Sequence, residues 1–307
     1  MNVNNVFVTG YSLNLSSFSS YSDYQVELLK LDSFVDSIPN YNNLDFCQDF
    51  LEYDLGGESL DDILYEVSGF NDPKYTEMLK EISFLSKGKK NGNYTNAVMA
   101  SADIGQVWNN EFISFYSQGK TIPNISPGLI VDSLTSLYRL NYSNLSNLPI
   151  SEESFTNRAK LMFSNISYHA GFESTLSTVK SGNFRLYSVE FTRALEALHN
   201  AFPKLTNKGN NQDDLVIISN EAAKSGRSMS CTVQGSNKLA LKKNFDLETQ
   251  DGKIKSFINL NCEYHLKINF DNNGNKLQSG FYNRAYFGLP LINGKKYIAL
   301  LHLGKHL

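Results

Sequence analysis

The sequence predicts an α+β fold, with a mostly helical N-terminal two-thirds followed by a small antiparallel β-sheet domain. Two observations support this prediction. Apolar residues recur at helical spacing up to about residue 200, whereas short alternating segments and turn signals dominate from Arg227 onward. The polar stretch Lys204–Asp213 lies between the two patterns. We therefore expect an acidic helical domain at residues 1–204 and a basic β domain at residues 205–307.

The N-terminal region is expected to hold one short strand and then helices. Pro39 ends the first helical pattern, and the sequence Asn71-Asp72-Pro73 is a helix-start signal with Asp72 as N-cap. The predicted elements are a strand at Val3–Val8, helices at Ser22–Ile38, Leu60–Val67, Asp72–Ser86 and Gly128–Leu140, and helices capped by Ser151 and by Ser188.

The C-terminal region is expected to hold short strands, beginning with Leu215–Ile218. Apolar and polar residues alternate strictly from Cys262 to Phe270, which is typical of a half-buried strand, and a second strand is expected around Tyr282–Phe287. The dipeptide Asn293-Gly294 predicts a tight hairpin turn. The sequence KKYIALLHL after it is apolar on both faces, so it is expected to be a central strand.

Charge is distributed unevenly along the chain. Residues 1–100 contain 6 Lys and Arg against 15 Asp and Glu, whereas residues 224–307 contain 13 against 5. This asymmetry indicates an anionic partner for the basic end, although the two ends could equally be separate solvated faces. We also expect that part of the acidic region, with Asp54, Glu58, Asp61 and Asp62 as contributors, lies over or beside the basic sheet and competes with nucleic acid for it. The alternative is that the acidic region is a helical scaffold that faces elsewhere.

The basic region concentrates residue types that suit RNA chemistry. Metal-independent RNA cleavage needs a base for the 2′-hydroxyl, an acid for the leaving 5′-oxygen, and cations for the phosphate. Tyrosine rings can stack on unpaired bases. The candidate catalytic residues are His265, Lys267, Arg284, His302 and His306, and the candidate substrate-binding residues are Tyr282, Tyr286 and Lys305.

A resemblance covers about the last fifty residues. The order His265-x-Lys267, then Arg284-x-Tyr286-Phe287, then an apolar strand ending in His302, resembles the C-terminal sheet of RelE/ParE-type ribonuclease toxins. The ending Leu303-Gly304-Lys305-His306-Leu307 also resembles that of uncharacterised bacterial proteins of toxin and phage-defence loci, with Ala285 in place of the usual branched residue. The resemblance implies a bacterial effector that acts on RNA.

Other interpretations of the same residues remain open. The sheet could bind nucleic acid or a nucleotide without chemistry while the helical part docks a partner or neutralising protein, or its polar face could simply be solvated. Cys262, His265, His302 and His306 have zinc-like spacings, but strand alternation places Cys262 and His265 on opposite faces. We therefore expect neither a metal nor a cofactor.

Composition narrows the class of protein. The chain has no apolar run near the 18 residues that a membrane span requires, and its start lacks a secretory pattern. Its three cysteines are odd in number and far apart, which argues against a disulfide framework and fits a reducing cytoplasm. Phosphate-binding glycine loops and the Gly-x-Ser-x-Gly elbow are missing.

Overall fold

The structure is a computed structural model of the chain and describes residues 2–14, 18–52, 58–87, 89–91, 107–108, 110–224, 227, 229–235, 241–249 and 251–307. It contains both helices and sheets, as an α+β chain should. The described residues form two compact units, Asn2–Asn141 and Tyr142–Leu307. The boundary between them differs from the predicted one, which lay between residues 204 and 205. The reason is that strand β7 (Ile166–Tyr168) pairs with β15 (Ile298–Lys305), so the segment after Asn141 belongs to the C-terminal sheet.

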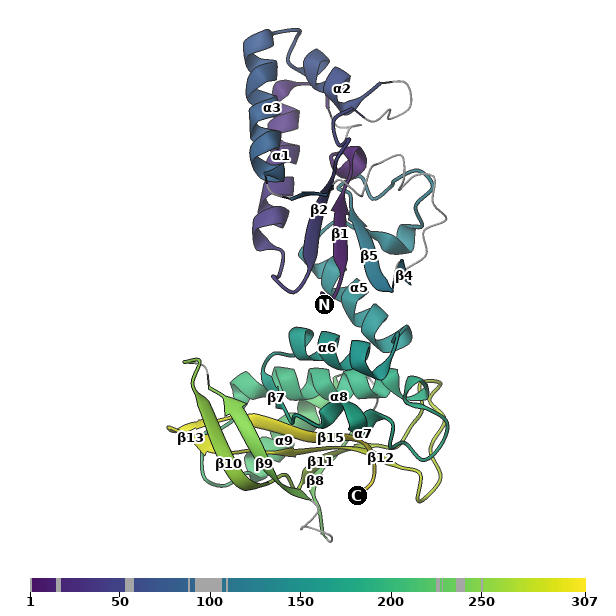
Figure 1. The fold of residues 1–307 in the computed structure, drawn as a ribbon, viewed down its shortest axis with the longest axis vertical. Coiled ribbons are helices and arrows are strands. Elements are labelled where there is room, and N and C mark those ends of the chain that lie inside the picture. Colours follow the sequence, from purple (N-terminus) through teal and green to yellow (C-terminus); the bar gives the residue numbers. More distant parts are fainter. Residues whose placement is uncertain are drawn as a thin grey trace. The chain divides into compact units, whose positions relative to one another are not determined.

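The N-terminal unit is built on a sheet that the sequence analysis missed. Among the described residues its order is β3-β2-β1-β5-β4, with β6 beside β5, and only the β4–β5 pair is antiparallel. Figure 1 shows the strands beside the long helices α1 and α3. The strands are β1 (Asn5–Val8), β2 (Asn43–Cys47), β3 (Lys90–Asn91), β4 (Val107–Trp108), β5 (Glu111–Tyr116) and β6 (Ile130–Val131). The helices are η1 (Gly10–Ser12), α1 (Tyr21–Ser37), α2 (Leu60–Val67), α3 (Asp72–Ser86) and η3 (Pro127–Leu129), and the boundary between the two units falls within α5 (Leu134–Asn147).

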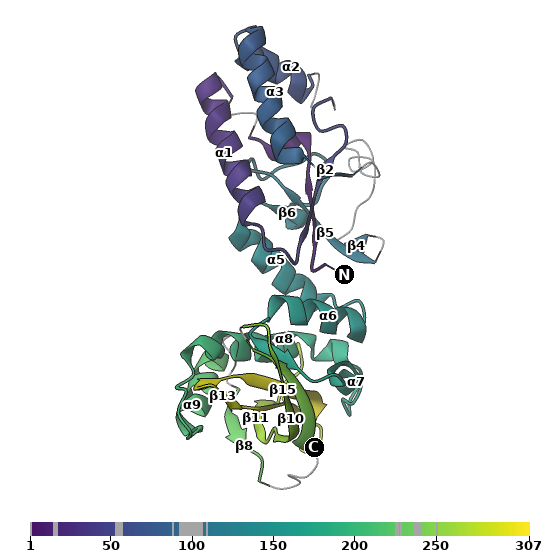
Figure 2. The same cartoon turned by 60° about the vertical axis from the view of Figure 1, so that its left-hand side comes forward.

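Two apolar layers cover this parallel sheet. On one face, Val6, Val8, Phe46 and Tyr116 pack with side chains of α1, α2 and α3 and with Leu137 of α5. Figure 2 shows α1 and α3 side by side along that face. On the other face, residues of β1, β2 and β5 pack with the connection from β5 to β6; they are Phe7, Cys47, Ile113, Phe115, Ile122, Ile125 and Leu129. Burial on both faces is usual for a parallel sheet.

The predictions for this unit were correct for the long helices α1 and α3, for the short helix α2 and for the strand β1. Asn71, not Asp72, is the N-cap of α3, because its side chain accepts the backbone N–H of Lys74. The helix predicted at Gly128–Leu140 is wrong in its first half, where η3 and β6 precede α5. Two of the acidic residues that were expected near the basic sheet can be described further. Asp54 lies outside the described residues, and Asp62 forms the capping box of α2 with the N-cap residue Ser59.

The C-terminal unit contains a five-stranded sheet in the order β7-β15-β12-β11-β8, antiparallel except for the β7–β15 pair, among the residues that are described. Its strands and those of two small hairpins are β7, β8 (Cys231–Val233), β9 (Lys242–Glu248), β10 (Ile254–Asn261), β11 (Tyr264–Ile268), β12 (Asn283–Gly288), β13 (Leu291–Ile292), β14 (Lys295–Lys296) and β15. The helices are α6 (Glu152–Met162), α7 (Phe172–Leu176), η4 (Phe184–Leu186), α8 (Ser188–Ala201), η5 (Phe202–Lys204) and α9 (Gln212–Ala223).

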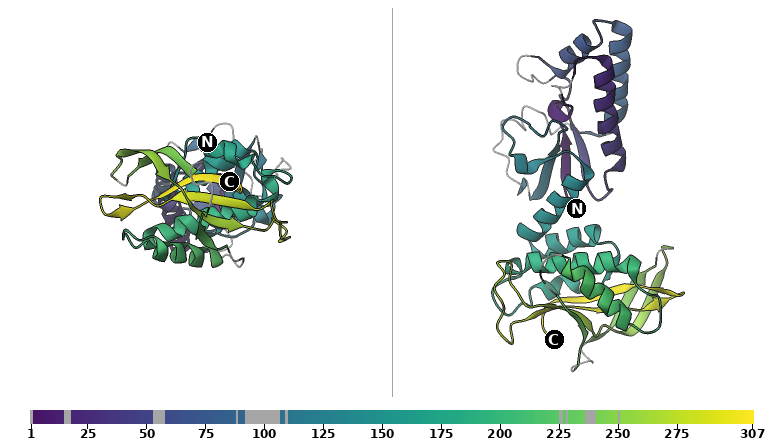
Figure 3. Two further views of the ribbon diagram at one scale, coloured as in Figure 1. Left: turned by 90° about the horizontal axis from the view of Figure 1, so that it is seen from below. Right: turned by 180° about the vertical axis from the view of Figure 1, so that it is seen from behind.

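The five-stranded sheet lies between unlike layers. Helices α8 and α9 cover one face, and the β9–β10 hairpin crosses the other (Figures 1 and 3). The prediction of a central C-terminal strand is confirmed, since β15 has β12 on one side and β7 on the other. The Asn293-Gly294 turn is also confirmed, because both residues have positive φ and join β13 to β14.

Two local predictions in this unit were wrong. Residues Leu215–Ile218 lie inside α9, because the short apolar run is the buried stripe of a helix and not a strand. Ser188 is the first residue of α8 and follows the N-cap Tyr187; its hydroxyl donates to the carbonyl of Ser146. Among the residues described, no helix is both long and apolar enough to cross a membrane.

Candidate functional site

The register of three strands brings the predicted residues together. His265 of β11 lies opposite Tyr286 of β12, and Tyr286 lies opposite His302 of β15. Lys267 lies opposite Arg284 in the same way. Directly paired residues of an antiparallel sheet point to the same side, as do residues two apart on one strand. These five side chains therefore share one face, as the alternation predicted; we call it the His265 face.

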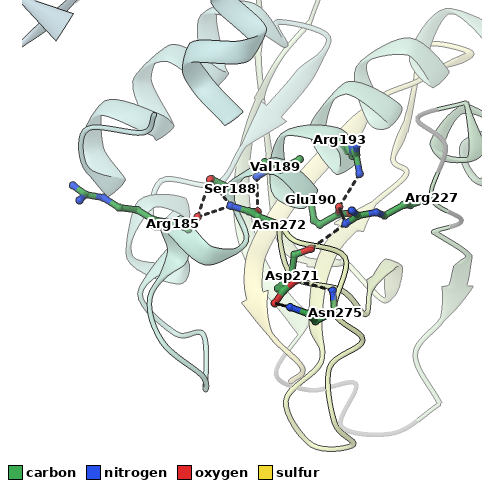
Figure 4. A network of polar contacts seen from close by, with 9 residues as sticks. All are labelled: Arg185, Ser188, Val189, Glu190, Arg193, Arg227, Asp271, Asn272 and Asn275. Carbon is green, nitrogen blue, oxygen red and sulfur yellow. Dashed lines mark hydrogen bonds and ion pairs between the residues drawn. The ribbon is translucent and has the colours of Figure 1, made fainter. Parts of the chain in front are cut away.

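A polar network holds the hairpin that carries this face (Figure 4). The Glu190 carboxylate at the start of α8 accepts from Arg193 and from Arg227, each at 2.7 Å, and Arg227 also donates to the Asp271 carbonyl at 3.0 Å. Burial raises the pKa of Glu190, and the two arginines oppose that rise. The Asn272 side chain accepts from the backbone N–H of Val189 in α8 and donates to the Arg185 carbonyl of η4 at 2.6 Å. The β11–β12 loop is thus fixed to the helix start.

The middle of the His265 face is buried, not open as its polar alternation indicated. Tyr286 has no exposed surface and packs with Leu241, Cys262 and Leu301. His265 is only 4% exposed and Arg284 only 6% exposed. The alternation describes side-chain direction correctly, but the β9–β10 hairpin and the last residues of the chain cover this part of the sheet.

The end of β15 and the residues after it secure that cover. Gly304 of β15 lies where a Cβ would clash with the Thr175 carbonyl of α7, so only glycine allows the helix to approach the strand. Beyond it, the His306 N–H donates to the Tyr282 carbonyl at 3.0 Å, and the Leu307 N–H donates to the Tyr286 hydroxyl at 3.2 Å. The Gly-Lys-His-Leu ending therefore has a structural reason.

His302 is held in one tautomer. Its Nε2 lies 2.9 Å from the Lys305 carbonyl, and because a carbonyl can only accept, Nε2 carries the proton. Burial lowers the pKa of His302 to about 4. Tyr286 separates His302 from His265, and two strand spacings of ~4.8 Å put their backbones roughly 10 Å apart. At this separation His302 is not placed to act with His265 on one substrate atom, which leaves His306 as the candidate partner of His265.

The two nitrogens of His265 differ in their partners. Its Nε2 lies 3.1 Å from the Thr232 hydroxyl of β8, whereas its Nδ1 is buried without a well-aligned hydrogen bond. Burial, followed by the positive charges of Arg284 and Lys267 and the nearby His306, lowers the pKa of His265 to about 4. A contact with the Glu263 backbone opposes the fall in the pKa of His265. The ring centroids of His265 and His306 are 6.4 Å apart. His306 is the exposed member of this pair, and burial, Arg284 and Lys180 lower its pKa.

Two cationic side chains, Arg284 and Lys267, act on His265 from the same face and lower its pKa. Arg284 donates to the Asn269 side chain at 3.0 Å and to the Asn283 carbonyl at 2.7 Å, and its Nε is buried without a partner. Within the described part of the chain, neither Arg284 nor Lys267 is paired with a carboxylate. The Arg284 guanidinium lies 5.2 Å from the centroid of the Tyr282 ring. This arrangement can accept an anion.

The zinc alternative finds no support in the geometry. The described residues contain no group of three His, Cys, Asp or Glu side chains arranged to hold a metal ion. Cys262 packs with Tyr286, and burial raises the pKa of its thiol to about 12, which disfavours a thiolate.

Sequence reasoning missed Thr232, Gln234 and Lys180. Thr232 reaches His265 only because β8 pairs with β11. Gln234 directly follows β8, and its side chain accepts from the Tyr286 hydroxyl at 3.4 Å. Lys180 comes from the segment after α7. No local sequence pattern marks such residues, because their roles depend on strand pairing and helix packing.

Comparison of the chain with models of known protein families, with curated proteins and with solved structures finds no match.

Proposed function

We propose that the C-terminal unit binds RNA and that the cations of the His265 face contact its phosphate groups. The observation that carries this proposal is the set of cationic side chains, Lys267 and Arg284 above all, that lie together with no carboxylate partner in the described structure. Their mutual repulsion is relieved when an anion binds, and phosphate is the anion that RNA presents at every nucleotide.

An unsatisfied donor supports an oxyanion ligand. Arg284 Nε carries a proton and is buried without a hydrogen-bond partner, and an unsatisfied buried polar group is costly. Half-exposed Lys267 and exposed His306 lie at the accessible rim of the same cluster. The half-buried Tyr282 ring beside Arg284 offers a surface on which an unpaired base can stack. These features favour single-stranded RNA.

A second candidate is metal-independent cleavage of the bound RNA, which the His265–His306 contact favours. One imidazole would take the 2′-hydroxyl proton as that oxygen bonds to phosphorus. The other would protonate the departing 5′-oxygen, which leaves a 2′,3′-cyclic phosphate and a 5′-hydroxyl. A bound phosphate would also raise the lowered pKa values of both imidazoles toward the working range.

The cellular role is proposed from the resemblance of the last fifty residues to ribonuclease toxins and phage-defence proteins. In that setting the chain would be an effector of a bacterial toxin or defence locus, with a neutralising protein as a partner. The same proposal includes a division of roles. The basic sheet domain acts on RNA, and the rest of the chain regulates it or docks the partner protein.

The test measures binding and turnover separately. Fluorescence anisotropy with a labelled single-stranded RNA in EDTA should show binding that weakens about 10-fold for Lys267→Ala, because one phosphate contact is lost. Lys208→Ala is the matched control, since this exposed lysine precedes α9 on the other side of the sheet. Equal affinity of Lys267→Ala and the unaltered protein would overturn the proposal.

Cleavage is followed in the same EDTA samples by gel electrophoresis. If the second candidate holds, the unaltered protein yields cyclic-phosphate ends and His306→Ala loses roughly 100-fold of the rate. Binding without turnover, or turnover only with added metal, would leave the protein as a binding module and reject the acid–base scheme.

A further inference from the structure

A pocket of about 520 Å³ lies in the N-terminal unit, between α1 and the segments that follow β5 and β6. Glu27 and Phe34 of α1 line it, together with Tyr116 at the end of β5, Gln118, and Asp132 after β6. The neighbours β2 and β5 lie on opposite sides of β1, which makes this edge a topological switch point. In open parallel sheets, ligands bind outside the carboxyl ends of the strands at such a point. The volume is in the range of small-molecule sites.

Two acceptor oxygens in the lining have no partner. Glu27 is 5% exposed; its Oε1 accepts from Lys30 at 2.6 Å, and its Oε2 is buried without a hydrogen bond. The Gln118 side-chain nitrogen donates to the Glu27 carbonyl at 2.8 Å, so its Oε1 is the free end of the amide, and that oxygen is also buried and unpartnered. Such a pair of vacant acceptors next to a cavity points to a ligand that carries hydrogen-bond donors.

Two further groups define the chemistry of the pocket. A hydrogen bond from Lys120 lowers the pKa of Asp132, which keeps this carboxylate ionised as an acceptor. Burial, Glu27 and Asp132 raise the pKa of Tyr116 to about 12, so its hydroxyl keeps its proton. The Tyr116 ring stacks on Phe34 with centroids 4.0 Å apart, which gives the pocket an aromatic wall.

The charges in the lining favour a neutral ligand over a free cation. Lys30 is paired with Glu27, and Lys120 is paired with Asp132 at 3.0 Å, so each carboxylate already has a counter-charge. A ligand must then offer several neutral donors close together and an apolar part for the aromatic wall. A ribonucleoside has both, because its 2′- and 3′-hydroxyls are adjacent donors and carboxylates in α/β folds accept hydrogen bonds from such diols.

We propose that this pocket binds a ribonucleoside, with its ribose diol donating to Glu27 and Gln118 and its base against the Phe34–Tyr116 wall. Entry requires only small movements. The Lys30 side chain is 57% exposed, so it can turn into solvent, and the terminal torsion of the Glu27 carboxylate turns easily.

Isothermal titration calorimetry of the full chain tests the proposal, with adenosine, guanosine, cytidine and uridine and their 2′,3′-dideoxy forms. At least one ribonucleoside should bind. Its dideoxy form should bind at least about 10-fold more weakly, because a charge-assisted hydrogen bond is lost. Glu27→Gln and Gln118→Leu should each weaken binding by a similar factor. Asp36→Asn is the matched control, since Asp36 is an exposed carboxylate of the same helix.

Three outcomes would overturn the proposal: no ribonucleoside binds at millimolar concentration, the dideoxy forms bind equally well, or spermidine binds in preference, which would define a cation site. If circular dichroism shows that Glu27→Gln is unfolded, Gln118→Leu decides alone, because Gln118 is only half-buried.

Discussion

Acidification should destabilise the C-terminal unit through His302, and replacing this histidine should remove a defined part of the effect. Its pKa is about 4 in the folded chain, because the imidazole is buried and its Nε2–H is bonded to the Lys305 carbonyl. The unfolded chain has a histidine pKa near 6.5. Between these values the unfolded state binds more protons, so stability is complete above about pH 6.5 and is lost as the pH falls toward 4.

The magnitude follows from the two pKa values. With an unfolded pKa of ~6.5 and a folded pKa of about 4, lowering the pH from 7 to 5 costs about 2 kcal/mol for this one group. His265, whose pKa is also lowered to about 4, contributes a similar loss. His302→Gln removes one of the two contributions, while its side-chain amide can still donate to the Lys305 carbonyl.

Hydrogen-exchange mass spectrometry at pH 7 and pH 5 measures this effect in peptides that cover β12 and β15, because it reports the opening free energy of that sheet. We expect the difference between the two pH values to be smaller in His302→Gln by about 2 kcal/mol. His306→Gln is the control for losing an exposed imidazole, and its effect should be smaller. An unchanged pH difference in His302→Gln would show that His302 is not held neutral by burial.

Other variants test the packing and the shielding. Lys296→Met removes one partner of the buried Lys296–Asp214 ion pair and should destabilise the C-terminal unit by about 3–5 kcal/mol. The double variant Lys296→Met with Asp214→Leu should recover most of that loss. Equal stability of the single and double variants in urea unfolding would contradict this. Gly304→Ala should cost roughly 2 kcal/mol or more by clashing with Thr175, and the control Gly235→Ala, which meets nothing within 4 Å, should be nearly neutral. If the acidic region competes with RNA, neutralising Glu58, Asp61 and Asp62 together should tighten RNA binding at low salt, as measured by anisotropy.

The sequence predicted the direction of side chains in the C-terminal sheet better than their burial. Alternation between His265 and Lys267 and between Arg284 and Tyr286 correctly placed these residues on one face, because the period of a strand is fixed by backbone geometry. Whether that face meets water depends on what packs against it. The β9–β10 hairpin and Leu307 come from other parts of the chain, and no local pattern reports their approach.

The parallel sheet of the N-terminal unit was missed for a related reason. Only β1 of its strands was predicted; the strands are short, and β5 shows an apolar run without alternation because it is buried on both faces. Such runs cannot be distinguished from pieces of buried helix by periodicity, and the same ambiguity turned Leu215–Ile218 of α9 into a predicted strand. The long helices α1 and α3 were predicted correctly because their length and start signals leave few alternatives.

The salt dependence of RNA affinity is the most direct test of the central claim that the His265 face binds phosphate. The logarithm of the binding constant should fall linearly with the logarithm of salt concentration, by about 0.7 for each phosphate contact with a single strand. Lys267→Ala should reduce that slope by ~0.7, whereas Lys208→Ala should leave it unchanged. An affinity that is independent of salt, or the same slope in Lys267→Ala and the unaltered protein, would contradict the account.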